Sequence, residues 1–213
     1  MPGRIAIKEN TVAVVPSPEV QAVACRDRCS GFLHKGSVSR ELSWMISRSY
    51  KRFFEQKKPV PTMFCELVNK LDKFFSVSRA SLVLHLPQSG DLKLVSWWDR
   101  HCLREGVIMS IPKKSSLLYR VLGAQSVFHK SVGRDIPCNY LERKLLISRS
   151  SQALIICPAV FTDVIYGLVS LASPVPYAFE LIENGIFQPV FVRFAQVIAE
   201  SKQFKQVLSI QVV

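Results

Sequence analysis

The chain has 213 residues, of which 48% are hydrophobic, and it carries a formal net charge of +12 at pH 7. This length and hydrophobic content suffice for one domain with a sizeable buried core plus extensions. The longest apolar run, residues 153–161, contains Pro158 and is far shorter than the roughly 20 residues of a membrane-spanning helix. The N-terminal apolar patch is also too short for the core of a signal peptide. We therefore expect a cytoplasmic protein that does not cross a membrane.

The basic excess is densest near the N-terminus. Residues 1–60 hold 11 basic and 5 acidic side chains, which is half of the net charge in little more than a quarter of the chain. Such an excess is typical of a surface for nucleic acid or for an acidic partner, and equally of a basic face that only contacts solvent. No nucleic-acid motif accompanies it, so nucleic acid is the less favoured partner.

The six cysteines are expected to be mostly reduced thiols, as is usual in longer unsecreted chains. Cys65 and Cys157 have apolar neighbours and are predicted to be small core residues. Cys25, Cys29 and His34 form the only cluster, but it lacks a fourth ligand and matches no zinc spacing. We interpret the cluster as a coincidence and expect no metal site.

The first quarter of the chain is predicted to contain an arm and one helix. Residues 1–37 have scattered prolines and glycines without a sustained period, which indicates a poorly ordered arm. Residues 38–58 are predicted to include an amphipathic helix, because Ser39 can cap it and apolar residues recur at helical spacing. The opposite face of this helix is basic and carries Arg48, Lys51 and Arg52.

The middle of the chain alternates between helical and strand periodicity. In chain order, the pattern predicts a helix at 62–75, strands at 80–86 and 92–98, a short helix at 115–122, a strand at 126–130 and a helical piece at 141–146. Gly123 is expected to stop the short helix. The rest of residues 100–149 is expected to be irregular.

Residues 153–160 are apolar in both alternating sets, which indicates a strand inside a sheet that is covered on both faces. A turn at 161–163 leads to an antiparallel return at 164–172. Gly167 weakens that strand unless another group approaches closely. We expect this group to be a C-terminal helix, which begins near Pro189 and crosses the sheet there.

The order of these elements resembles that of a GAF domain. The matching residues are SSQALIICP at 150–158, followed by YGLVSL at 166–171, and the helix–glycine–strand passage at 116–127 is similar to the same family. The resemblance covers roughly residues 62–205 and leaves 206–213 as a C-terminal tail. It implies an α/β (α+β) fold with a central antiparallel sheet of about five or six strands and helices packed on one face.

The resemblance also implies a function. GAF domains are sensory and regulatory domains, and their ligand pocket lies under the segment that roofs the second face of the sheet. We therefore expect a sensory or regulatory domain that binds an unidentified small molecule; neither a ligand nor a cofactor is identified by the residues. Many GAF domains dimerise through their first and last helices, so a homodimer through residues 39–56 and the C-terminal helix is expected, with a protein partner carrying the output. A basic nucleic-acid-associated protein and a dimerising scaffold without ligand are the alternatives.

The expected ligand pocket lies between the second face of the sheet, with Ala153, Ile155 and Cys157, and the segment 100–149. Its candidate contacts are the aromatic, hydroxyl, thiol and acidic side chains of Trp97, Trp98, His101, Ser110, Tyr119, His129, Asp135, Cys138, Tyr140 and Cys157. The basic balance favours an anionic ligand. Arg48, Lys51 and Arg52 are the candidate contacts for nucleic acid or an acidic partner.

Three cofactor or catalytic chemistries are disfavoured. The Asp135-Ile136-Pro137 motif is similar to one of bilin-binding GAF domains, but the attaching Cys-His pair is absent. Haem would need one histidine as an axial ligand of the iron, and His101 and His129 are the candidates. One GAF family reduces free methionine sulfoxide with three cysteines, whose nearest equivalents are Cys102, Cys138 and Cys157, but the spacing after Cys138 is too long. With no other catalytic motif, we expect no enzyme.

Overall fold

The computed structural model describes residues 46, 48, 50–100, 102–131, 136–183 and 185–201. Its centre is a six-stranded antiparallel sheet with the strand order β3-β2-β1-β6-β5-β4. The strands are β1 (Arg79–Leu86), β2 (Asp91–Asp99), β3 (Cys102–Ser110), β4 (Phe128–Ser131), β5 (Ala153–Phe161) and β6 (Val164–Ser173). β5 lies inside the sheet between β6 and β4, so the predicted antiparallel sheet with an interior β5 is confirmed.

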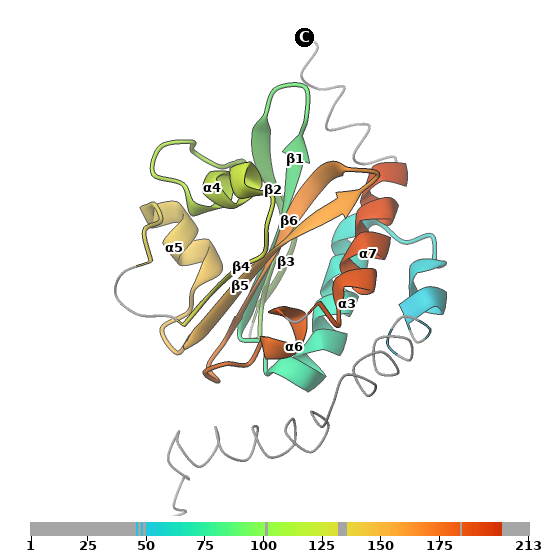
Figure 1. Ribbon diagram of the computed structural model, residues 1–213, viewed down its shortest axis with the longest axis horizontal. Helices are drawn as coiled ribbons and strands as arrows, with labels where there is room; N and C mark the ends of the chain where they lie inside the picture. Colours follow the sequence, from blue (N-terminus) through green and yellow to red (C-terminus); the bar gives the residue numbers. More distant parts are fainter. Residues whose placement is uncertain are drawn as a thin grey trace, which may run out of the picture.

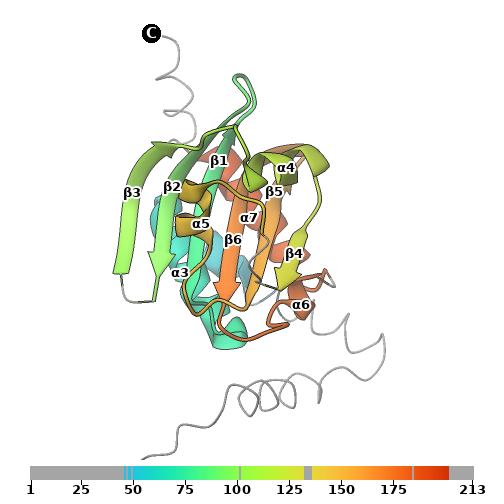
Figure 2. The same ribbon diagram turned by 90° about the vertical axis from the view of Figure 1, so that its left-hand side faces the viewer.

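Helices cover both faces of this sheet. On one face lie α3 (Val60–Phe75), α6 (Glu180–Glu183) and α7 (Gln188–Glu200), and on the other lie α4 (Leu117–Ala124) and α5 (Tyr140–Leu146) (Figures 1 and 2). α3 presents Phe64, Leu67 and Leu71 to the core with no exposed side-chain area, as its helical spacing predicts. The two short helices of the second face are the part that roofs the sheet where a ligand is expected.

A helical segment at residues 50–54 packs onto α7 within the same chain. Tyr50, Phe53 and Phe54 are buried, and the Phe54 ring centroid lies 6.1 Å from that of Phe194 in α7. The described apolar side chains of the helix expected at the homodimer interface therefore pack within this chain's own core. The homodimer stays a prediction. The arm 1–37, with Cys25, Cys29 and His34, and the tail 206–213 lie outside the described residues.

Replacing Phe54 with alanine is expected to lower the free energy of unfolding by about 2–4 kcal/mol, because the ring leaves a cavity against α7. Urea denaturation measures this loss, and Arg52→Ala, which removes an exposed side chain of the same segment, is the matched control. An unchanged stability in Phe54→Ala would show that residues 50–54 do not pack on α7 in solution.

The predicted elements differ from the structure in three places. Residues 102–110, expected to be irregular, form the edge strand β3, because Arg104, Glu105 and Gly106 hide its alternation. α4 continues through Gly123 and ends where Gln125 adopts a left-handed backbone with φ of 51°. The four-residue helix α6 has no predicted counterpart, since it is shorter than the period that would reveal it.

We expected Gly167 to be required by the C-terminal helix. It is required instead by the neighbouring strand. It pairs with Leu84 of β1, and a Cβ atom added at Gly167 would lie 2.6 Å from the backbone oxygen of Val83. The predicted close approach is therefore real, but it occurs within the sheet.

Candidate functional site

The two faces of β5 are the reverse of the prediction. Ala153, Ile155 and Cys157 belong to the core that α3 and α7 cover, whereas Leu154 and Ile156 lie under α4 and α5. Alternation divides a strand into two sets of side chains, but it does not say which helices cover which set. Cys157 consequently lies on the face away from the expected ligand pocket.

Trp97 and Trp98 also point to opposite faces. Trp98 is 7% exposed, and its Nε1–H donates to Asn69 Oδ1 of α3 at 3.1 Å, which makes it part of the helix-covered core. Trp97 is half-buried on the other face, with the Arg79 guanidinium 5.1 Å from its ring centroid. The two rings therefore do not form one wall of a pocket.

The sheet face under α4 and α5 is packed with apolar side chains. These are close to fully buried and include Val83, Leu94, Leu118, Ile136, Leu146, Leu154, Ile156, Leu168 and Ala172. They come from β1, β2, β5, β6, both short helices and the segment before α5, so they interdigitate across the whole layer. The space in which we expected a ligand to lie against the sheet is, among the described residues, a second hydrophobic core.

A buried carboxylate joins the two short helices. Glu142 of α5 has no exposed area and accepts hydrogen bonds from the N–H groups of Leu117 and Leu118, at 2.8 and 3.1 Å, and from the Ser116 hydroxyl. Its own N–H donates to Asn139 Oδ1 at 2.9 Å in a capping box. The negative charge lies at the N-terminus of α4, where the helix dipole favours it. The free amides of α4 are thus used by an internal anion.

A hollow of about 500 Å³ lies at the outer rim of these helices. We call it the rim hollow; its lining residues are Lys113, Ser115, Ser116, Tyr119, Arg120, Pro137 and Cys138. Tyr119 and Cys138, two of the predicted ligand contacts, come together here. The Tyr119 hydroxyl accepts from the Leu92 N–H at 2.9 Å, and the Lys113 ammonium lies 5.8 Å from the Tyr119 ring centroid.

The electrostatics of the rim hollow are positive. Arg120 donates to the carbonyl oxygens of Pro137 and, at 3.3 Å, Ser116, which holds its guanidinium at the rim. Lys113 forms an ion pair with Asp91 at 3.1 Å outside the lining. No lining residue carries a carboxylate. The hollow therefore offers two cations and the hydroxyl groups of Ser115 and Tyr119 to an anion.

The thiols differ in how accessible they are. Burial raises the pKa of both Cys138, which is half-buried at the rim, and Cys157, which is almost fully buried. Since the thiolate is the reactive form, we expect iodoacetamide to alkylate Cys138 slowly in the folded protein and Cys157 only after unfolding. The Cys138 rate should still rise with pH beyond about 8.5, where an ordinary cysteine is half ionised. Peptide mass spectrometry measures both rates, and equal labelling of the two native thiols would contradict the placement.

The remaining predicted contacts do not converge on the rim hollow. Ser110 is exposed and accepts from Lys93 Nζ at 2.7 Å, and His129 lies half-buried on β4. Tyr140 is 73% exposed, with Lys144 Nζ 4.6 Å from its ring centroid. His101 and Asp135 lie outside the described residues.

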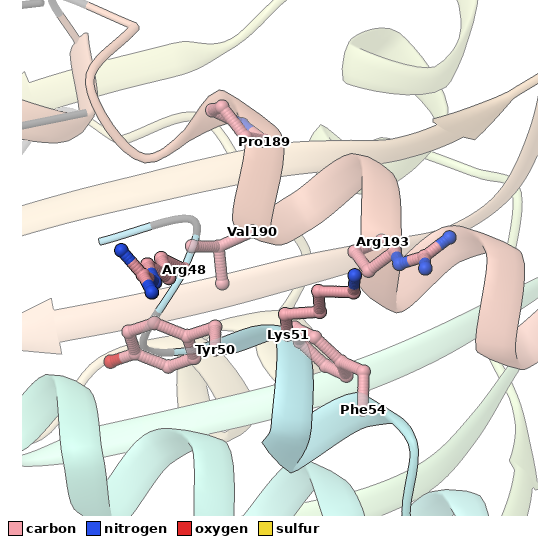
Figure 3. A pocket seen from close by; sticks show the side chains of 7 residues that line it. All are labelled: Arg48, Tyr50, Lys51, Phe54, Pro189, Val190 and Arg193. Carbon is pink, nitrogen blue, oxygen red and sulfur yellow. The ribbon is translucent and has the colours of Figure 1, made fainter. Parts of the chain in front are cut away.

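A second hollow, of about 320 Å³, lies between α7 and the segment that holds Arg48 and residues 50–54. We call it the basic groove; Figure 3 shows its lining residues, which are Arg48, Tyr50, Lys51, Phe54, Pro189, Val190 and Arg193. Two of the predicted basic contacts, Arg48 and Lys51, line it, but Arg52 does not. Arg193 was missed, although it follows Pro189 by four residues and so shares its helix face.

The described ranges contain neither a metal-binding cluster nor a membrane-spanning helix. None of their histidine, cysteine or acidic side chains gather in threes at positions suited to a metal ion. No helix in these ranges has both the length and the apolar character needed to span a bilayer.

No protein-family model and no curated protein matches this chain. Solved structures do match it in fold. The GAF domain of a phosphoenolpyruvate-protein phosphotransferase from Coxiella burnetii is 11% identical, with a TM-score of 0.60 over 77% of this chain and 96% of that chain. The corresponding domain from Acinetobacter is also 11% identical, with a TM-score of 0.59 over 77% of this chain and 97% of that chain.

An enzyme shares the fold as well. A type II free methionine-R-sulfoxide reductase from Thermoplasma acidophilum is 13% identical, with a TM-score of 0.50 over 66% of this chain and 93% of that chain. At such identities the likeness concerns the fold alone, and the fold does not separate a binding domain from a reductase. In this chain Cys138 and Cys157 lie on opposite faces of the sheet, so these two thiols do not form one site.

Proposed function

We propose that this chain, whose fold is that of a GAF domain, is a regulatory domain that binds a small anionic molecule in the rim hollow. The proposal is carried by the composition of the lining. Lys113 and Arg120 lie around the hollow together with the hydroxyl groups of Ser115 and Tyr119, and no lining residue has a carboxylate. Its volume of about 500 Å³ is within the usual range for small-molecule sites. A ligand with a phosphate or carboxylate group has the matching chemistry, because guanidinium groups bind both through paired hydrogen bonds.

The position of the rim hollow supports a regulatory role. Its lining joins the residues that precede α4 to Pro137 and Cys138, which precede α5. A ligand that bridges these two segments stabilises the contact that Glu142 makes between the same helices. The separation of Cys138 from Cys157 favours this binding role over a cysteine-dependent reduction.

Calorimetric titration with phosphoenolpyruvate, citrate and a nucleoside monophosphate tests the proposal. We expect at least one of these probes to bind, and Lys113→Ala to weaken its affinity about three- to tenfold through the loss of one charged contact. Lys114→Ala is the matched control, because Lys114 is an exposed neighbour that does not line the hollow. Saturable binding that is equal in both variants, or no binding of any probe, would contradict the proposal.

A scaffold without ligand is the second candidate, and the tightly packed layer under α4 and α5 favours it. On this reading the homodimer, formed through residues 39–56 and α7, carries the function. Light scattering at micromolar concentration tests this candidate, since a scaffold must be dimeric without any ligand. A monomer would contradict the scaffold, whereas a dimer that binds no anion would contradict the first proposal.

A further inference from the structure

The basic groove brings together cations from two parts of the chain that are far apart in sequence. Arg48 and Lys51 come from the segment before α3, and Arg193 comes from α7; all three are exposed. In Figure 3, Arg48 lies on one side of Val190, with Lys51 and Arg193 on the other. Arg193 donates to Gln196, which is neutral, and none of the lining residues is acidic. The groove therefore presents a positive potential to anything that enters it.

The floor of the groove is apolar and fixed in place. Tyr50, Phe54 and Val190 are at most 8% exposed, and their rings or methyl groups form part of the main core. The Tyr50 ring centroid lies 6.2 Å from that of Phe53. Burial raises the pKa of the Tyr50 phenol to about 12, so this side chain is uncharged at neutral pH. An aliphatic or aromatic side chain of a ligand can cover this floor and exclude water from the surrounding charges.

We propose that the basic groove binds an acidic segment of a partner protein, in which apolar side chains alternate with carboxylates. The apolar floor takes the apolar side chains, and Lys51 and Arg193 pair with the carboxylates. This site is separate from the rim hollow, on the opposite side of the sheet, and gives the regulatory domain a surface through which it contacts an output protein.

The groove fits this occupant better than two others. Duplex nucleic acid is bound through a track of cations along its phosphates and needs no apolar floor, and Arg52, which would extend such a track, does not line the groove. A second copy of this chain in a two-fold contact would place the same three cations against their equivalents, which is unfavourable. Charge complementarity therefore selects an acidic peptide.

Fluorescence anisotropy with a fluorescein-labelled peptide of repeated Glu-Glu-Leu-Phe units tests the proposal on the full chain. We expect saturable binding that weakens as salt rises from 0.1 to 1 M, because the screening length falls from about 10 to about 3 Å. Lys51→Glu and Arg193→Glu should each weaken binding about five- to tenfold, since each change removes an attraction and adds a repulsion. Arg52→Glu, with the same charge change beside the groove, should stay within about twofold.

A peptide of repeated Glu-Glu-Ser-Ser units distinguishes the contribution of the apolar floor to the affinity from that of the cations. We expect it to bind about tenfold more weakly, because serine does not cover the apolar floor. Equal affinity for both peptides, or an equal loss in Lys51→Glu and Arg52→Glu, would overturn the proposal. The proposal would also be overturned if a single-stranded DNA oligonucleotide bound through Lys51 and Arg193 more tightly than the acidic peptide. A dimer that dissociates on substitution of these two residues would overturn it as well. All of the substituted side chains are exposed, so an unchanged thermal unfolding midpoint shows that each variant is folded.

Discussion

Replacing Glu142 with alanine is expected to lower the free energy of unfolding by about 3–5 kcal/mol. The substitution leaves the N–H groups of Leu117 and Leu118 and the Ser116 hydroxyl without their acceptor, and these residues are at most 3% exposed. It also removes the negative charge from the N-terminus of α4. Because single domains are stable by only about 5–15 kcal/mol, much of the folded population should be lost under mild denaturant.

Urea denaturation measures this effect, and two variants bracket it. Glu142→Gln keeps one carbonyl acceptor but turns an amide group toward hydrogen-bond donors, so we expect a smaller loss of about 1–3 kcal/mol. Glu55→Ala removes an exposed carboxylate and should change the stability by less than about 0.5 kcal/mol. If Glu142→Ala were as stable as Glu55→Ala, the buried carboxylate would not hold α4 and α5 together.

Gly167→Ala is expected to lower the free energy of unfolding by about 2–3 kcal/mol. The added methyl group would lie 2.6 Å from the Val83 backbone oxygen, so β1 and β6 must move apart at the centre of the sheet. Gly123→Ala is the matched control. Gly123 is exposed on α4 and has open space around it, so the substitution should stabilise the protein by about 0.5–1 kcal/mol. Chemical denaturation of both variants gives the sign of each change, and a neutral Gly167→Ala would contradict the strand packing.

Most of the fold follows from local periodicity. The interior strand β5 and its hairpin with β6 were predictable, because residues 153–160 are apolar in both alternating sets and a short polar turn follows. The edge strand β3 was not, because its alternation is interrupted and an edge strand needs only one neighbour. The faces of β5 were reversed, since the choice between helix layers depends on packing that no local pattern contains.

The candidate site was predictable only in part, for a related reason. Tyr119 and Cys138 were expected in a shared pocket and both line the rim hollow. Glu142 was missed because a glutamate in a short helix is usually exposed, and its partner amide at Leu117 lies 25 residues earlier in the chain. Arg193 was missed because it joins Arg48 and Lys51 only after α7 has packed on residues 50–54.

The most direct test of the proposed function is NMR mapping of the bound anion. After titration with the probe that binds in calorimetry, we expect the largest amide shift changes at Ser115, Tyr119 and Cys138, which line the rim hollow. The amides of Leu154 and Ile156, in the apolar layer beneath α4 and α5, should change little. The opposite pattern, with the largest changes at Leu154 and Ile156, would mean that the ligand enters between the sheet and the helices and would contradict the rim hollow as the site.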